Sequence, residues 1–314
     1  MAILVTGSSG YLGRSLVQYY RQHNHDVVGI DRKASPWTDK VGSITDVAFV
    51  DNAIRGCDTL IHTAALHKPH LQWHKPEDFI HVNITGTRIL LEAAVNNSCK
   101  RIVFTSTTST FGENMRRKKH HNAIWVSEKL IPIPEDIYDV TKITAENLCW
   151  LCHKDAGLNI VVLKTSRFFS EDDIHHELRR RYDQNNLKVN EFICRRVDIR
   201  DVVTAHAQAV IKADDLGFEN LIISSTSPLC IDDMKQAGRD LIGILKKKKI
   251  VYKDIYQQYK WEMFQSVDCV YANTLARKKL DWSPKTNFET VLQSMREDDT
   301  YLKKLFDENH KNIK

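Results

Sequence analysis

The stretch "AILVTGSSGYLG" at residues 2–13 decides the fold. It opens with an apolar run of strand length, and the following "YLGRSLVQYYRQHN" (11–24) has the spacing of an amphipathic helix. A second apolar run, "DVVGID" (26–31), comes next. Strand, glycine-rich turn, helix and strand make one βαβ unit. Strands without polar alternation predict a parallel sheet covered by helices on both faces.

Three glycines in this stretch have the spacing of a loop that holds a dinucleotide. Gly7 permits the tight turn, Gly10 lets the backbone approach a pyrophosphate, and Gly13 allows the helix to pack closely on the strand. The helix N-terminus adds free N–H donors and a positive dipole end for the anion. The other loop residues that we expect to contact the cofactor are Ser9, Tyr11 and Leu12.

The acid at the end of the second strand sets the expected cofactor. Asp31 lies 18 residues after Gly13, near the spacing of about 20 at which such a carboxylate binds the adenosine ribose. It would accept hydrogen bonds from both ribose hydroxyls and repel a 2′-phosphate, which favours NAD over NADP. Arg32 and Lys33 favour NADP, since either can bind a phosphate, and NADP stays as the less favoured alternative. Near the adenine we expect Ser43 and Ile44.

Strands and helices alternate through the first half of the chain. Further buried strands are expected at "DTLIHTAA" (58–65), "KRIVFTST" (100–107) and "NIVVLKTSR" (159–167). Helical patterns, among them "DVAFVDNAIRG" (46–56), separate these strands. The alternation predicts a doubly wound α/β sheet of the Rossmann type.

The second half of the chain is less regular. Strand and helix patterns occur there at 171–186 (a polar helix), 195–213 (strand then helix), 220–226 (a strand), 232–247, 273–282 and 287–306 (helices). We expect a dinucleotide-binding domain at residues 1–170, which residues 195–213 rejoin. Residues 171–314 are expected to form a smaller, mostly helical substrate-binding cap.

Composition and charge are those of a globular enzyme, with 42% hydrophobic and 27% charged residues. No apolar run reaches membrane-spanning length, so no membrane association is expected. The N-terminus passes directly into the glycine loop, which argues against a signal peptide and favours the cytoplasm. The net charge is +5, but the basic runs at 116–121 and 246–249 lack interleaved aromatic residues, so no nucleic-acid partner is expected.

A tyrosine and a lysine lie one helical turn apart in an otherwise ordinary helical segment. "EDIYDVTKITAENLCWLC" (135–152) places Tyr138 and Lys142 four residues apart and therefore on one face. Taken alone, such a pair is more often an exposed contact than a site. Motifs elsewhere in the chain decide between the two interpretations.

The order of motifs resembles the extended short-chain dehydrogenase/reductases, the NAD-dependent epimerase/dehydratase group that includes nucleotide-sugar epimerases. The motifs that carry the resemblance are "TGSSGYLG" (6–13), "HTAA" (62–65), "NITGT" (83–87), "TSTTSTFG" (105–112), "YDVTK" (138–142) and "LDWSPKT" (280–286). They stand in the family's order over nearly the whole chain. In this family Asn83 is a structural position.

The resemblance implies a catalytic role for the tyrosine and the lysine. Lys142 and the positive nicotinamide ring would favour the phenolate of Tyr138, whose pKa is about 10 when free. Tyr138 would take the proton of a substrate hydroxyl while hydride leaves the same carbon. Thr107 aligns with the family residue that binds the reacting oxygen. Cofactor contacts are expected from Thr63, Ala64, Ala65, Thr105, Tyr138 and Lys142.

The substrate side departs from the family pattern. "TSRFFSEDD" (165–173) lacks the asparagine that often touches the diphosphate of a nucleotide sugar, and Cys194 aligns with the family's phosphate-binding arginine. The neighbouring Arg195 and Arg196 can bind a phosphate or pair with Asp198 or Asp201. The substrate-binding residues that we expect are Lys68, His70, Thr108, Arg167, Arg195 and Arg196. No metal is expected, because the histidines near residue 70 lack a completing carboxylate or cysteine.

Several reactions share this machinery. We expect an epimerase-like oxidoreductase that acts on a sugar hydroxyl, in a nucleotide sugar, with an NAD(P)-dependent ketone or alcohol reductase of a non-sugar metabolite as the alternative. A dehydratase is disfavoured, because Thr107 is followed by Thr108 and Ser109 and not by two acids. A cofactor-bound scaffold would not need the intact motifs. By analogy with the family, helices at 77–97 and 135–155 would form a homodimer.

Overall fold

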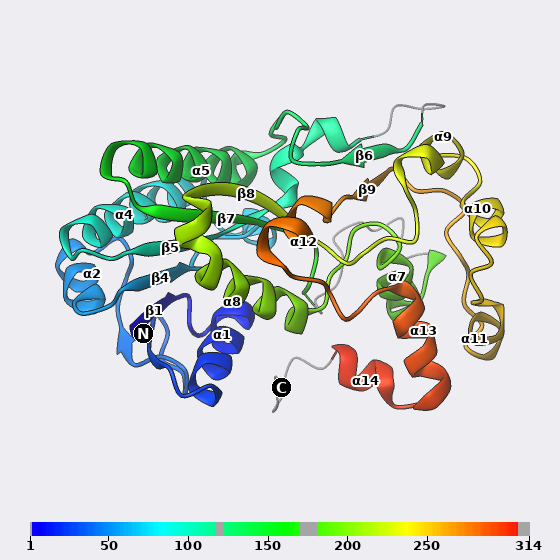
Figure 1. Cartoon of the computed structure of the whole chain (residues 1–314), viewed down its shortest axis with the longest axis horizontal. Helices are drawn as coiled ribbons and strands as arrows, with labels where there is room; N and C mark the ends of the chain where they lie inside the picture. Colours follow the sequence, from blue (N-terminus) through cyan, green and yellow to red (C-terminus); the bar gives the residue numbers. More distant parts are fainter. Residues whose placement is uncertain (1, 117–121, 170–180, 307–314) are drawn as a thin grey trace.

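The structure is a computed structural model that describes residues 2–116, 122–169 and 181–306 (Figure 1). Its main sheet has seven parallel strands in the order β3-β2-β1-β4-β5-β7-β8. These strands are β1 (Ala2–Thr6), β2 (Asp26–Asp31), β3 (Lys40–Val41), β4 (Thr59–His62), β5 (Arg101–Thr107), β7 (Asn159–Thr165) and β8 (Phe218–Ile223). The strand order reverses between β1 and β4, and the glycine-rich turn follows β1 at this point, where ligands of open α/β sheets bind.

Helices cover both faces of the sheet and explain why its strands are continuously apolar. Ile3 and Val5 of β1 belong to one buried cluster, whereas Leu4 between them belongs to another on the opposite face. The first face is covered by α1 (Tyr11–Gln22), α8 (Ile199–Leu216) and α12 (Thr274–Leu280), and the second by α2 (Val47–Ile54), α4 (Gly86–Asn96) and α5 (Ile137–Ala156). The predicted α/β fold is confirmed.

The cap lies beside the sheet, at the right of Figure 1, around a separate hydrophobic core. Its elements are β6 (Ile124–Val126), α7 (Gln184–Glu191), a short helical turn η5 (Ile231–Asp233), α9 (Met234–Ala237), α10 (Leu241–Lys247), α11 (Lys253–Gln258), β9 (Cys269–Tyr271), α13 (Phe288–Glu297) and α14 (Tyr301–Phe306). β6 and β9 pair in parallel as a small second sheet. The cap is therefore not purely helical.

Several elements differ from those that the sequence predicts. The single helix expected at 232–247 is two helices, because α9 ends at Ala237 before Gly238, and Asp240 accepts a hydrogen bond from the Gly243 N–H to start α10. The strand expected after Arg195 is reduced to one bridge between Arg167 and Arg196. Most of the helix predicted at 171–186 and most of the basic run at 116–121 lie outside the described residues.

The connection between β4 and β5 begins with a short helical turn, η1 (Lys68–Gln72), and continues as one long helix with an irregular middle. Its three parts are α3 (Pro76–Phe79), a π-helical turn η2 (Ile80–Thr85) and α4. After β5, the turns η3 (Thr108–Phe111) and η4 (Glu113–Met115) lead toward β6. No helix in the described part of the chain combines the length and the apolar composition that crossing a bilayer requires.

Candidate active site

The glycine-rich turn after β1 is a backbone cradle. Gly7 has a φ of +73°, and a Cβ there would lie 2.9 Å from the Ala64 nitrogen. A Cβ on Gly13 would lie 2.0 Å from the Gly7 oxygen, so α1 can approach β1 only with glycine there. At Gly10 a Cβ would meet only the Gly7 oxygen, at 3.2 Å, among the described residues. This open side and the N-terminus of α1 suit a pyrophosphate.

The different surroundings of Gly13 and Gly10 predict that alanine at Gly13 lowers stability, whereas alanine at Gly10 weakens NAD binding. Gly13→Ala forces backbone apart, so we expect it to lower the free energy of unfolding by about 1–3 kcal/mol. Gly10→Ala places its methyl group in the open side of the cradle, so it should keep the melting temperature and weaken NAD binding. Thermal melting and calorimetric titration with NAD measure the two effects. Equal melting temperatures for the two variants would contradict the packing role of Gly13.

Asp31 ties the cradle to the end of β2. Its Oδ2 accepts a hydrogen bond from the Ser9 N–H at 3.0 Å, and its Oδ1 accepts one from the Lys33 N–H at 2.9 Å. Two carboxylate oxygens offer about four acceptor positions, so Asp31 retains the capacity to bind ribose hydroxyls. The residues present therefore fit a dinucleotide at this turn.

The remaining expected cofactor residues lie at the C-terminal ends of neighbouring strands. Thr63, Ala64 and Ala65 directly follow β4, and the N–H groups of Thr63 and Ala64 both donate to the Thr6 hydroxyl at 3.1 Å. Ser43 and Ile44 follow β3, where the buried Ile44 packs against Gly86. Because parallel strands end at one edge, these residues share the edge that carries the glycine turn.

His62 and Asn83 brace this edge from inside. His62 Nδ1 bonds the Thr6 hydroxyl at 2.8 Å and Nε2 bonds the Thr87 hydroxyl at 3.0 Å. Burial, and then the charge of Lys142, lower the pKa of His62 to about 3. Asn83 bonds the N–H and carbonyl of Leu66 and the hydroxyl of Thr141. Both side chains are satisfied core groups.

Tyr138 lies buried in the first turn of α5, which starts where Asp136 accepts a hydrogen bond from the Asp139 N–H. The side chain of Thr107, the last residue of β5, is near enough to act on the phenol of Tyr138. Burial raises the pKa of Tyr138, the side chain of Thr107 lowers it, and nearby carboxylates, Asp139 first, raise it further. Thr107 and Tyr138 are thus brought together as the sequence predicts.

Lys142 lies one turn further along α5 but contacts the sheet. Its Nζ donates to the Thr105 carbonyl at 2.8 Å and lies 4.1 Å from the centre of the Phe104 ring. Burial lowers the pKa of Lys142 to about 8, although the charge of Glu146 opposes this shift. The ammonium is therefore fixed by a strand carbonyl, and the expected effect of Lys142 on the phenol stays a prediction.

A row of aromatic rings joins the glycine turn to the tyrosine. Tyr11 lies 6.4 Å from Phe168, whose ring stacks on Phe169 at 4.2 Å. Phe169 lies 5.7 Å from His67, and His67 lies 6.3 Å from Tyr138. Burial, followed by the charges of His70 and Lys142, lowers the pKa of His67 to about 3. This row spans from the cradle to the reacting residues.

Two of the expected substrate residues near β4 have defined partners. Lys68 Nζ lies 2.9 Å from Asp136 Oδ2, and also near Glu135 and Asp139. Burial lowers the pKa of Lys68, but these carboxylates outweigh burial and raise it. His70 Nδ1 accepts a hydrogen bond from the His67 N–H at 2.8 Å. Thr108 is buried and its hydroxyl donates to the Thr165 carbonyl at 3.4 Å.

Three arginines surround one buried carboxylate at the boundary with the cap. Glu191 contacts Arg195 and Arg196 at 2.9 Å and Arg167 at 3.4 Å. Arg196 is itself buried and also donates to the Phe169 carbonyl, whereas the side chains of Arg167 and Arg195 are 27% and 26% exposed. Three guanidinium groups thus converge on one carboxylate at this boundary.

Two other carboxylates, which the sequence suggests as partners for these arginines, are bound elsewhere. Asp198 binds the guanidinium of Arg200 at 2.7 Å. Asp201 accepts hydrogen bonds from the N–H groups of Lys285 and Thr286. Both aspartates therefore have structural roles around α8. Glu191 belongs to a segment whose sequence pattern is too irregular to place.

Other site residues were missed because long-range contacts define them. Ser109 and Asp139 lie beside Thr107 and Tyr138, and Ser109 Oγ donates to Asp139 Oδ1 at 2.8 Å. Glu146, one turn after Lys142, binds the buried ammonium of Lys164. The only signal in the sequence was the position of each residue next to a motif.

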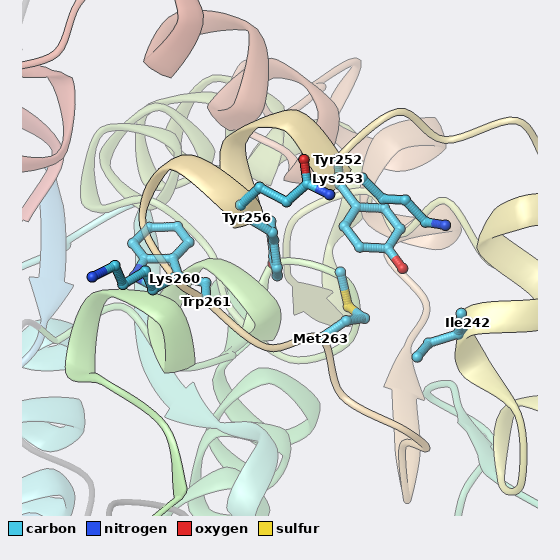
Figure 2. Close-up of a pocket in the computed structure, with 8 residues that line it drawn as sticks. Ile242, Tyr252, Lys253, Tyr256, Lys260, Trp261 and Met263 are labelled. Carbon is cyan, nitrogen blue, oxygen red and sulfur yellow. The ribbon is translucent and has the colours of Figure 1, made fainter.

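A hollow of about 340 Å³ lies in the cap, far from this edge. It lies between α10 and α11, and Figure 2 shows its lining side chains, which are Ile242, Tyr252, Lys253, Tyr256, Gln257, Lys260, Trp261 and Met263. This hollow is wide open to solvent, and Thr107, Tyr138 and Lys142 are not among the residues that line it. We therefore place the candidate active site at the sheet edge.

The fold and the glycine cradle define a dinucleotide-binding α/β protein of the Rossmann class. Residues 3–217 match the NAD dependent epimerase/dehydratase family. The chain belongs to this family of NAD-dependent enzymes. The resemblance that the motifs predict, and NAD as the cofactor of the family, are confirmed.

Individual relatives cover part of the chain. A UDP-glucose 4-epimerase of Halalkalibacterium halodurans is 30% identical over 176 residues, 52% of this chain and 50% of the relative. A 3-beta-hydroxysteroid dehydrogenase of Mycolicibacterium neoaurum is 27% identical over 182 residues, 54% of this chain and 48% of the relative. The chain spans about half the length of the curated relatives it matches.

A solved structure extends the likeness to the cap. The UDP-glucuronic acid 4-epimerase of Bacillus cereus, in complex with UDP-glucuronic acid and NAD, superposes with a TM-score of 0.66 at 21% identity. The match covers 97% of this chain and 100% of that chain. At this identity the likeness shows the fold alone.

Proposed function

We propose that the chain is an NAD-dependent, epimerase-like oxidoreductase that acts on a hydroxyl of a nucleotide sugar. The observation that carries the proposal is that Thr107, at the end of β5 on the edge that carries the glycine cradle, acts on the phenol of the buried Tyr138. Bound NAD would supply the acceptor and donor of the hydride. Tyr138 exchanges a proton with the reacting oxygen, Thr107 orients that oxygen, and Lys142 holds the nicotinamide ribose.

The boundary between sheet and cap would hold the nucleotide part of the substrate. In this proposal residues 1–170, with 195–213, bind NAD, and residues 171–314 close over the sugar nucleotide. Arg167 and Arg195 are partly exposed beside Glu191, and guanidinium groups match the geometry of a diphosphate. Lys68, His70, Thr108 and Arg196 stay candidates for substrate contacts.

The test identifies the cofactor and the substrate class together. The purified protein is denatured, any released dinucleotide is identified by mass, and UDP-glucose, UDP-N-acetylglucosamine and UDP-glucuronic acid are then incubated with the native protein and followed by NMR. We expect one of them to form its epimer with the parent protein and not with Tyr138→Phe. If no UDP-sugar changes, the proposed substrate class is wrong.

A second candidate function is a reductase of a non-sugar ketone. Phe168 and Phe169 occupy the segment in which the family often carries an asparagine. Their stacked rings give this part of the site an apolar surface. A 3-beta-hydroxysteroid dehydrogenase is among the relatives. Steady oxidation of added NADH by a 3-ketosteroid, without epimerisation of UDP-sugars, would favour this function.

We also propose that the chain forms a homodimer through the face of α5 and η2. Val140 and Leu151 of α5 are 42% and 47% exposed and lie on one helical face, and Ile80 of the adjacent η2 is 44% exposed. Light scattering should give twice the mass of the chain. The double variant Val140→Glu/Leu151→Glu should give the mass of one chain, with Val251→Glu on the cap as the control. A single-chain mass for the parent would refute the dimer.

A further inference from the structure

A chain of hydroxyl groups leads from the tyrosine to a buried acid. The Thr107 side chain acts on the Tyr138 phenol and lowers its pKa, and Thr107 Oγ1 donates to Ser109 Oγ at 3.2 Å. Ser109 Oγ in turn donates to Asp139 Oδ1 at 2.8 Å. With the phenol as donor, every hydrogen in the chain points from Tyr138 toward Asp139. Such an alignment permits a proton to move along the chain without rotation of any side chain.

Two helix starts hold this chain in place. Thr107 begins η3, and its hydroxyl accepts a hydrogen bond from the Ser109 N–H at 3.1 Å. Asp139 lies in the first turn of α5, next to Tyr138, with no exposed surface. Both ends of the hydroxyl chain are therefore fixed by secondary structure, and Ser109 bridges them.

The far end of the chain leads toward solvent. Asp139 Oδ2 accepts a hydrogen bond from the Glu135 N–H at 3.2 Å and lies 3.7 Å from Lys68 Nζ. Lys68 also contacts Asp136 and Glu135, and Arg116 binds Glu135. The side chain of Lys68 is 32% exposed. Among the described residues, these charged groups connect Asp139 to the surface.

We propose that Ser109 and Asp139 form a proton relay that serves Tyr138 through Thr107. As the Tyr138 O–H bond breaks, Thr107 gains that proton and gives its own to Ser109, which gives its own to the Asp139 carboxylate. Three O–H bonds break and three form, and no electrons are transferred. The same steps in reverse return the proton. The inference rests on the proposed role of Tyr138 as the base.

Two further observations agree with this assignment. Burial raises the pKa of Asp139, although Lys68 and the bond from Ser109 oppose the shift, so this carboxylate accepts a proton more readily than an exposed one. The Nζ of Lys142 donates to the Thr105 carbonyl. The hydroxyl chain therefore offers the proton of Tyr138 a route that does not pass through Lys142. Neither Thr108 nor Ser109 is an acid, but the fold brings the carboxylate of Asp139, from α5, to Ser109.

Substitution of Ser109 tests the relay in turnover, with UDP-glucose as the probe. Ser109→Ala removes the middle hydroxyl, and we expect kcat to fall by about tenfold or more, with KM unchanged and a larger solvent deuterium isotope effect. Ser109→Thr restores a hydroxyl and should restore kcat. Melting temperatures of both variants check that they fold. If Ser109→Ala equals the parent while Tyr138→Phe is inactive, the relay is wrong and the proposed function stands.

A second measurement needs no sugar. After a rapid rise in pH, the ultraviolet absorbance of phenolate that the parent shows and Tyr138→Phe lacks reports ionisation of Tyr138 in the NAD-loaded protein. We expect this signal to form about tenfold more slowly in Ser109→Ala and at the parent rate in Ser109→Thr. Equal rates in all three proteins would overturn the relay, whatever the substrate is. Full turnover of UDP-glucose by Tyr138→Phe would overturn the proposed function and the relay together.

Discussion

Replacement of Tyr138 by phenylalanine is expected to lower kcat by at least about 10²- to 10⁴-fold, the contribution of a positioned acid–base group. The substitution removes one oxygen from a buried ring and keeps the shape of the side chain. Tyr138 is buried in the first turn of α5 beside Thr107, so the phenylalanine ring should keep the position of the tyrosine ring. The rate of epimer formation by NMR measures the loss.

The binding of NAD separates this chemical effect from a structural one. Tyr138→Phe should keep most of the affinity for NAD, because it leaves intact the glycine cradle after β1 and Asp31 at the end of β2. Its melting temperature should also stay within a few degrees. Retained turnover with normal NAD binding would mean that another group exchanges the proton.

The substitution Glu146→Ala is expected to lower the free energy of unfolding by about 3–5 kcal/mol, because it leaves a buried ammonium without its counter-ion. Lys164 of β7 bonds both carboxylate oxygens of Glu146, and their side chains are 5% and 9% exposed. Ser106 donates to the same carboxylate, and Thr110 accepts from Lys164. Urea denaturation followed by circular dichroism measures the loss.

A double substitution provides the control. Glu146→Leu/Lys164→Met replaces the ion pair with apolar groups of similar volume and should restore most of the stability. Turnover should recover in part, because Glu146 raises the pKa of Lys142 and Lys164 lowers it, so the effects of the two removed charges oppose each other. If Glu146→Ala is as stable as the parent, the ion pair between Glu146 and Lys164 contributes little to the free energy of unfolding.

The sequence predicts the sheet well because its strands are local signals. β1, its glycine turn and α1 follow one another without a gap, and both faces of β1 are apolar since helices cover both. The same reasoning places Asp31 at the end of β2 and Thr107 at the end of β5. Motifs at strand ends meet at one edge by the rule for parallel sheets.

The parts that the sequence misses depend on contacts between distant residues. Lys164 looks like an interruption of an apolar strand until Glu146, on another element, is seen to bind it. β6 and β9 are three residues each and pair across a separation that no periodicity reports. The arginines after Cys194 are adjacent to aspartates in sequence, but they converge on Glu191 because the chain turns back there.

The π-helical turn η2 sets the rotation of the two halves of the helix between β4 and β5. A π turn holds more residues than an α turn, so α4 is rotated about its axis relative to a continuous helix that begins at α3. Asn83 stands in this turn and reaches both Leu66 and Thr141. Deletion of one residue from η2 would give a continuous α-helix. The Asn83 side chain would then be rotated away from Leu66 and Thr141. The strand-end segment before η1 would then lose its anchor to α5, so a single inserted residue holds Leu66 and the helix of Tyr138 in a fixed relation.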